Sequence, residues 1–175
     1  MTKFEQEQKI IQIQALADSL LSKTYMVDVG KIPHIKMNPK LDGWKWEFDR
    51  AKQRFGVCCY SARRIGLSYQ LCLLNSLEEI KDTLLHEIAH AICGSRHNHD
   101  WYWKTVAKAI GARGERCYSP DTVIEVPGRY AYACPKCNHT SYKHRRVQKN
   151  YACRSCCTKY NHGRFDARFI LKLQV

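Results

Sequence analysis

Two histidines four residues apart carry the clearest chemical signal in this sequence. They enclose His86-Glu87-Ile88-Ala89-His90, an HExxH motif. On a helix, side chains four positions apart lie one turn apart on the same face, so both imidazoles can reach one Zn²⁺ ion at roughly 2.0–2.1 Å. Glu87 projects beside the pair and can take a proton from a water that the metal activates. The motif therefore predicts metal-assisted hydrolysis of a peptide bond; the alternative is a solvated helix face that carries two histidines by chance.

A catalytic zinc ion usually takes a third protein ligand and keeps a fourth position for water. Four downstream residues are candidates for this ligand: His97, His99, Glu115 and Glu125. We favour His99, because the neighbouring Asp100 can cap a following helix and so anchor the backbone. His97 is the second choice, since it falls in the freer part of the loop.

Other residues near the motif limit the class of enzyme. The extended metzincin pattern requires Gly at 93 and His at 96, where this sequence has Cys93 and Arg96, and all of its methionines lie upstream of the motif. The metzincin class is therefore excluded. Arg96 and Tyr102 are the candidate donors for stabilising a tetrahedral intermediate.

A second metal motif lies near the C-terminus. Cys134-Pro135-Lys136-Cys137 and Cys153-Arg154-Ser155-Cys156 are two CxxC pairs separated by 15 residues. Four thiolates at this spacing predict a structural zinc site in a zinc ribbon, with a strand over 142–147. Cys157, His139 and His144 remain alternative ligands. The other cysteines are expected to be small buried residues: Cys58, Cys59, Cys72, Cys93 and Cys117.

The charge of the chain is concentrated around these cysteines. The 175 residues carry a formal charge of +13, of which residues 129–175 hold 11 Lys and Arg against one acid, Asp166. Cations neutralise phosphates and aromatic rings stack on unpaired bases, so we expect a surface for single-stranded or junction DNA rather than only a solubilising face. The expected nucleic-acid-binding residues are Lys143, Arg145, Arg146, Lys149 and Arg154.

The elements that must position these groups indicate an α+β fold. Spacing of apolar residues predicts a helix over 3–24, and alternation predicts strands over 44–48, 55–60 and 64–73 in an antiparallel meander. Ser76 and Glu79 form a capping-box pattern that opens the HExxH helix, which Gly94 ends, and another helix is expected over 101–110. Turn residues and the step in charge place a boundary between a catalytic domain, 1–128, and a basic zinc ribbon, 129–175.

Several of these segments together resemble the SprT-like (Spartan-related) metallopeptidase family. They are Arg54-Phe55-Gly56-Val57-Cys58, Ile65-Gly66-Leu67-Ser68, the run from Leu84 to Ala91, and the run from His97 to Lys104. The resemblance implies a zincin-like domain in which His99 completes the zinc site, followed by a zinc ribbon. It also implies proteolysis of proteins that are crosslinked or bound to DNA.

The sequence also indicates where in the cell such a protein is located. No run approaches the roughly 18 apolar residues of a membrane helix, and the first residues lack the pattern of a signal peptide. We therefore expect a cytoplasmic protein without a membrane partner, associated with the nucleoid or chromosome. The leading hypothesis is a zinc-dependent endopeptidase that acts on DNA-associated proteins; the alternative is a nucleic-acid-binding zinc protein that has a zincin fold but little turnover.

Overall fold

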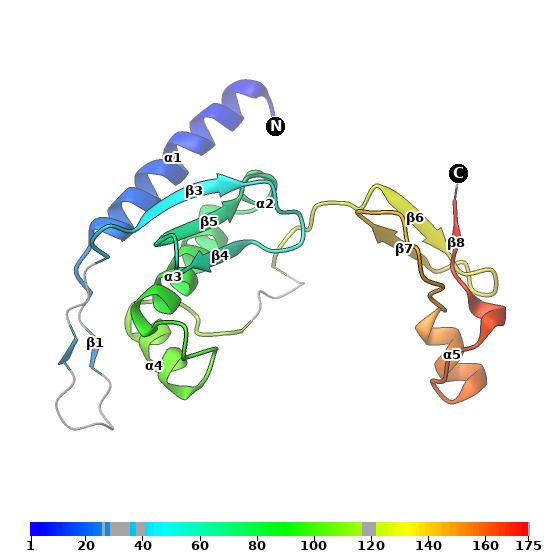
Figure 1. Ribbon diagram of the computed structural model, residues 1–175. Coiled ribbons are helices and arrows are strands. Elements are labelled where there is room, and N and C mark those ends of the chain that lie inside the picture. The colour runs from blue at the N-terminus through cyan, green and yellow to red at the C-terminus, as the bar shows by residue number, and fades with distance from the viewer. Residues whose placement is uncertain (26, 29–35, 38–40, 117–121, 175) are drawn as a thin grey trace. The chain divides into compact units, whose positions relative to one another are not determined.

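The computed structural model describes residues 1–175 except 26, 29–35, 38–40, 117–121 and 175 (Figure 1). The described residues form two compact units, Met1–Val126 and Pro127–Val175. Both mix helices with small sheets, so the α+β class is confirmed. None of the described helices is long and apolar enough to cross a membrane.

The first unit begins with helix α1, Lys3–Ser22, where Thr2 and Glu5 form a reciprocal capping box. A short antiparallel pair follows, β1, Val27–Asp28, with β2, Lys36–Met37. The predicted helix over 3–24 is thus confirmed to within two residues at its end.

The central sheet differs from the predicted meander. Its strands are β3, Lys45–Asp49, β4, Gly56–Cys59, and β5, Arg64–Ser68, in the order β3-β5-β4. β5 pairs antiparallel with β4 but parallel with β3, so the prediction of an antiparallel sheet is wrong. Burial agrees with the strand order, since Ile65 and Leu67 of the central strand β5 are fully buried.

The predicted third strand is also too long. β5 ends at Ser68, whose hydroxyl accepts a hydrogen bond from the Leu71 backbone N–H and so caps helix α2, Tyr69–Leu74. The same hydroxyl donates to the Ala51 carbonyl at 2.6 Å, which fixes the connection between β3 and β4.

Helix α3, Leu77–Cys93, is the predicted HExxH helix. Ser76 caps it by accepting from the Glu79 N–H at 3.3 Å, and Gly94 ends it at a φ of 78°. The Glu79 side chain does not complete a capping box, because it pairs with Arg113 instead. Helix α4, Trp101–Ala109, follows, with Asp100 as its N-cap.

One hydrophobic core joins these elements, since α1 packs on α3 and α3 also contacts α4, β4 and β5. Fully burying an aliphatic side chain of this size stabilises a fold by about 1.5–3 kcal/mol. The fully buried aliphatic residues of α1, β5, α3 and α4 are Ile13, Ile65, Leu67, Ile80, Leu84, Ile88 and Val106.

The second unit has a three-stranded antiparallel sheet of order β7-β6-β8. Its elements are β6, Tyr130–Ala133, β7, Thr140–Lys143, helix α5, Arg154–Asn161, the 3₁₀ turn η1, Ala167–Phe169, and β8, Lys172–Leu173. The strand expected over 142–147 is therefore displaced to 140–143. Four cysteines and Phe169 make up the buried core of this unit. So small an apolar core is typical of small domains that a bound metal stabilises.

Candidate metal sites

Three imidazoles converge at one point of the first unit. His86 and His90 project from α3, and His99 comes from the turn that precedes α4. The Nε2 atom of His99 lies 3.0 Å from Nε2 of His86 and 3.0 Å from Nε2 of His90. The ligand atoms of all three lie within 4.8 Å of one another, so this group could hold a metal ion.

The turn between the two helices places His99, and not His97, beside His86 and His90. Gly94 ends α3, and His99 itself adopts a φ of 57°, which brings its ring back toward α3. Asp100 anchors the turn, because one carboxylate oxygen accepts from the Trp103 N–H at 2.9 Å and the other lies 2.8 Å from Nδ1 of His97. His97 is thus held by Asp100 and lies outside the histidine group.

The chemistry of these rings fits a zinc ion. Tetrahedral ligation at roughly 2.0–2.1 Å places nitrogens about 3.3–3.4 Å apart, close to the 3.0 Å observed between Nε2 atoms. Burial lowers the pKa of His86 and of His90 to about 4, and it also lowers the pKa of His99. All three rings are therefore neutral at pH 7, which is the form that binds metal.

Neighbouring groups orient the rings. His86 is hydrogen-bonded to the backbone of Glu115 and His90 to the backbone of His97, and both contacts act to raise the pKa, as expected when a ring N–H donates to a carbonyl oxygen. Since the Nε2 atoms face one another, these bonds fix the opposite ring nitrogens. The buried Trp103 ring packs against the three imidazoles at centroid distances of 4.6, 5.0 and 4.6 Å.

Glu87 lies beside this group with only 7% of its surface exposed. Burial raises the pKa of its carboxyl group to about 7, against the opposing effects of the Arg54 charge and of a hydrogen bond with the Cys58 backbone. A divalent cation in the histidine group would act in the same direction as Arg54 and lower this pKa. Gly56 of β4 borders the carboxylate so closely that an added Cβ would lie 2.7 Å from Oε1.

A cavity of about 620 Å³ opens over Glu87 and the three histidines. Its further lining residues include Arg54, Tyr60, Arg113, Glu115 and Arg116. Arg54 pairs with Asp49 at 2.7 Å, and Arg113 pairs with both Glu79 and Asp82.

Sequence reasoning misplaced some residues of this site and missed others. Among the residues that the structure describes, Arg96 and Tyr102 do not line the cavity, and Tyr102 packs on the His97 ring instead. Glu115 contributes to the cavity wall, and Glu125 lies outside it. Gly56 and Trp103 were missed as site residues, although their sequence segments carried the family resemblance.

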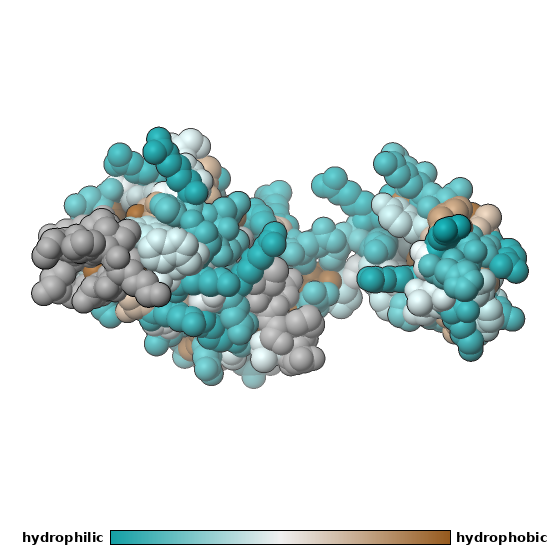
Figure 2. Space-filling view, turned by 90° about the horizontal axis from the view of Figure 1, so that it is seen from below, coloured by the Kyte–Doolittle hydropathy of each residue, from teal (hydrophilic) through white to brown (hydrophobic). Residues whose placement is uncertain are grey.

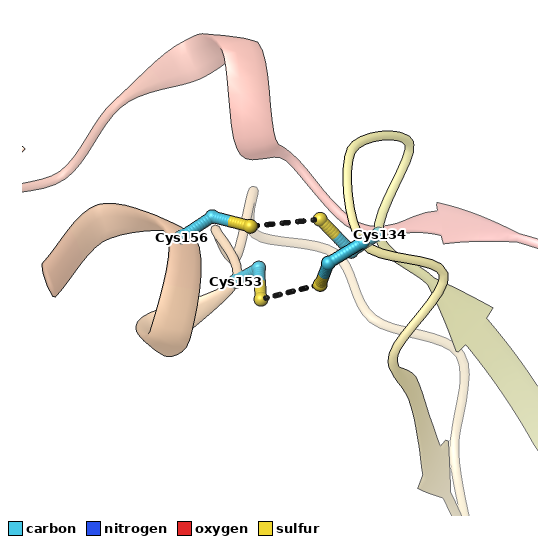
Figure 3. A group of neighbouring side chains, drawn as sticks. Cys134, Cys153 and Cys156 are labelled. Carbon is cyan, nitrogen blue, oxygen red and sulfur yellow. Dashed lines mark hydrogen bonds between the residues drawn. The ribbon is translucent and has the colours of Figure 1, made fainter. Parts of the chain in front are cut away.

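The second group joins Cys134, Cys137, Cys153 and Cys156 (Figure 3). The Sγ atoms of Cys134 and Cys156 lie 3.7 Å apart, as do those of Cys137 and Cys153. Tetrahedral zinc ligation with Zn–S near 2.3 Å places sulfurs about 3.8 Å apart, so these thiols fit zinc. Figure 3 shows Cys153 and Cys156 at the start of α5, facing the turn that follows β6.

The alternatives to these ligands lie outside the group. Cys157 is buried but does not belong to the four-thiol cluster, and neither do His139 and His144. The expectation of buried cysteines elsewhere holds only in part: Cys72 is buried, whereas Cys58, Cys59 and Cys93 are only half-buried. Cys117 lies outside the described residues.

The predicted nucleic-acid-binding cations spread over the second unit. Lys143 ends β7, Arg154 begins α5, and the other three occupy the segment between these elements: Arg145, Arg146 and Lys149. Large aromatic residues of this unit are exposed: Tyr142, Tyr151, Tyr160 and Phe165. The sole acid of the unit, Asp166, is engaged by Arg168 at 2.7 Å. Figure 2 shows hydrophilic residues over most of the visible face of this unit.

A comparison with known protein families relates this chain to one of them. A sequence model of the SprT-like family matches residues 31–125, which include α3 and the histidine group. No solved structure gives a significant match to the chain.

Proposed function

The chain belongs to the SprT-like family, and on this premise we propose that it is a zinc-dependent endopeptidase that cleaves DNA-associated or DNA-crosslinked proteins. Family membership suggests a metallopeptidase-like function. The observation that carries the proposal for this chain is the convergence of three neutral imidazoles beside a buried carboxylate at the wall of an open cavity. In this reading the first unit is a zincin-like domain, and His86, His90 and His99 are the zinc ligands.

The residues of the site have different roles in hydrolysis. A zinc ion held by the three imidazoles would polarise the substrate carbonyl and lower the pKa of water. Glu87 accepts the proton of the attacking water and later delivers it to the leaving nitrogen. Its hydrogen bond with the Cys58 backbone holds the carboxylate at the cavity wall.

An extended substrate has a place to bind beside these groups. β4 is an edge strand of the described sheet, and its residues Gly56, Val57 and Cys58 line the cavity. An edge strand presents backbone donors and acceptors that can pair with a peptide segment. Such pairing would suit unfolded or loosely folded chain segments as substrates.

The second unit supports the DNA-directed part of the proposal. Its net charge of +10 and its exposed aromatic rings suit single-stranded or junction DNA. We expect Lys143, Arg145, Arg146, Lys149 and Arg154 to contact phosphates. The four-thiol group would hold the structural zinc that keeps this surface folded.

The decisive experiment compares wild type with Glu87→Gln on a protein bound to single-stranded DNA. Cleavage is followed by gel electrophoresis with and without DNA, and Glu125→Gln, which alters an exposed glutamate outside the cavity, serves as the control. Loss of cleavage in Glu87→Gln alone is expected. If wild type binds two zinc ions and DNA but cuts nothing, the chain is a nucleic-acid-binding zinc protein and the peptidase proposal is wrong.

A separate experiment tests the DNA surface. Substituting Arg145, Arg146 and Lys149 by Gln would remove three phosphate contacts. The plot of log K for single-stranded DNA against log salt concentration should then have a slope that is shallower by about 2. Fluorescence anisotropy at several salt concentrations measures it. The matched control replaces three exposed lysines of the first unit, Lys3, Lys52 and Lys81, by Gln. Equal losses in both triple variants would refute a surface located on the second unit.

A further inference from the structure

We propose that the Tyr60 hydroxyl is a catalytic hydrogen-bond donor that stabilises the oxyanion of the tetrahedral intermediate. This inference rests on the proposed peptidase function, because it names the second electrophilic group of the same site. Removing one preorganised donor of this kind typically costs about 10²–10³ in kcat.

The position of Tyr60 brings it to the reacting groups. It follows β4 directly and lines the cavity together with Glu87 and the three histidines. Cys58, two residues earlier, contacts the Glu87 carboxylate through its backbone and lines the same cavity. Cys59 between them is turned to Ser61, with Sγ and Oγ 3.7 Å apart. Cys58, which is hydrogen-bonded to Glu87, and Tyr60, the proposed donor, therefore lie on the same wall of the cavity.

The Tyr60 hydroxyl has no hydrogen-bond partner among the residues that the structure describes, whereas the two tyrosines that are buried have one. Tyr25 donates to the Leu20 carbonyl at 2.7 Å, and Tyr132 accepts from the Val147 N–H at 2.9 Å. The Tyr60 ring packs edge-on against Trp44 at a centroid distance of 6.4 Å, which restricts its motion. A held ring with a free hydroxyl at a cavity wall is suited to bind a ligand oxygen.

The state of the hydroxyl agrees with a donor role. Burial raises the pKa of Tyr60 to about 12, with contributions from Cys58, Cys93 and Glu87, so the phenol keeps its proton at neutral pH. Two arginines of the cavity wall are already engaged by carboxylates, Arg54 by Asp49 and Arg113 by Glu79. Arg116 also lines the cavity, although it is exposed to solvent. It is the alternative hydrogen-bond donor to the oxyanion, and the test therefore includes it.

Tyr60 assists the attack of water on the substrate carbonyl. The water oxygen forms a bond to the carbonyl carbon, its proton passes to Glu87, and the carbonyl π pair moves onto the carbonyl oxygen. Tyr60 donates a hydrogen bond to this oxygen without transferring its proton. When the C–N bond breaks, the pair returns to re-form the carbonyl, and Glu87 gives its proton to the leaving nitrogen.

The test compares Tyr60→Phe with wild type, with Arg116→Gln, and with Tyr102→Phe as the matched control outside the cavity. We expect Tyr60→Phe to lower kcat about 100-fold with KM within about twofold, while zinc content and melting temperature stay at wild-type values. The affinity of the zinc-loaded chain for a peptide phosphinate, which mimics the tetrahedral intermediate, should fall by the same factor in calorimetry.

The outcomes separate this inference from the proposed function. If wild type cleaves and Tyr60→Phe equals it, or if only Arg116→Gln loses rate, the role of Tyr60 is refuted while the peptidase stands. If wild type does not cleave, the peptidase proposal fails, and unchanged phosphinate affinity in Tyr60→Phe refutes the donor role as well. Should Tyr60→Phe fold poorly, Tyr60→Gln, which keeps a donor, must exceed Tyr60→Leu in kcat for the inference to survive.

Discussion

Substituting Gly56 by Ala should impair Glu87 by crowding its carboxylate, while Glu87 itself and the three histidines stay unchanged in sequence. The added Cβ would lie 2.7 Å from Oε1 and 2.8 Å from Cγ of Glu87, and 2.8 Å from Cγ2 of Thr83. Ordinary contact begins near 3.4 Å, so the carboxylate must shift by about 0.7 Å. Gly56 is not among the residues with positive φ, so crowding is the only cost of the substitution.

The magnitude follows from this displacement. A misplacement of about 1 Å costs roughly 10²-fold in rate, so a shift of about 0.7 Å should lower kcat/KM by about 10- to 100-fold. The loss cannot exceed that of Glu87→Gln, which removes general-base catalysis worth about 10²–10⁴-fold. Overpacking should also lower the free energy of unfolding by about 1–3 kcal/mol, or roughly 4 °C in melting temperature per kcal/mol.

Gly66→Ala is the control that separates crowding from catalysis. Its Cβ would lie 2.9 Å from Oδ2 of Asp49 and 2.9 Å from Cγ1 of Val57, so it crowds the same sheet to a similar degree without meeting Glu87. Steady-state cleavage of a DNA-bound protein gives kcat/KM, and circular dichroism gives the melting temperature. The reasoning is refuted if Gly56→Ala keeps kcat/KM within twofold of wild type, or if both variants lose activity equally.

Three further predictions follow from the metal sites and the ion pairs. His99→Ala should reduce bound zinc from two ions to one per chain, whereas His97→Ala should keep both. Plasma emission spectrometry measures the zinc content, and the reverse pattern would contradict the choice of His99 as ligand. Cys153→Ser should abolish DNA binding because the small cysteine core of the second unit depends on metal, yet leave cleavage of a free peptide intact, as fluorescence assays of both would show. Arg113→Gln should lower the free energy of unfolding by about 1–3 kcal/mol, since it leaves the buried Glu79 without its partner; urea melts against Arg50→Gln measure this, and equal midpoints would refute it.

The parts of the fold that the sequence predicted are those governed by local signals. The bounds of α3 follow from the Ser76 cap and from Gly94, which ends the helix with positive φ. Those of α4 follow similarly from the Asp100 cap. The convergence of His86, His90 and His99 could be expected because two helix ends and a short turn constrain it. Such signals act within a few residues and do not depend on the rest of the chain.

The errors concern pairing and packing between distant segments. The parallel pairing of β3 with β5 depends on the course of the chain between β3 and β4, which no periodicity reveals. Helix α5 was missed because its sequence has no apolar stripe. The helix begins at the point where Cys153 and Cys156 face the other two thiols of the group. The place of Tyr60 on the cavity wall likewise depends on how β4 lies against α3.

Helix α3 couples stability to chemistry through its two faces. Ile80, Leu84 and Ile88 of this helix are fully buried in the core, while His86 and Glu87 reach the cavity wall. A core substitution such as Leu84→Ala would cost about 2–5 kcal/mol, and it would also displace the face that holds the base and the histidines. The desolvation that raises the pKa of Glu87 and keeps the imidazoles neutral comes from the same packing. Activity should therefore fall in core variants before the chain unfolds, because the site needs both its position and its low polarity.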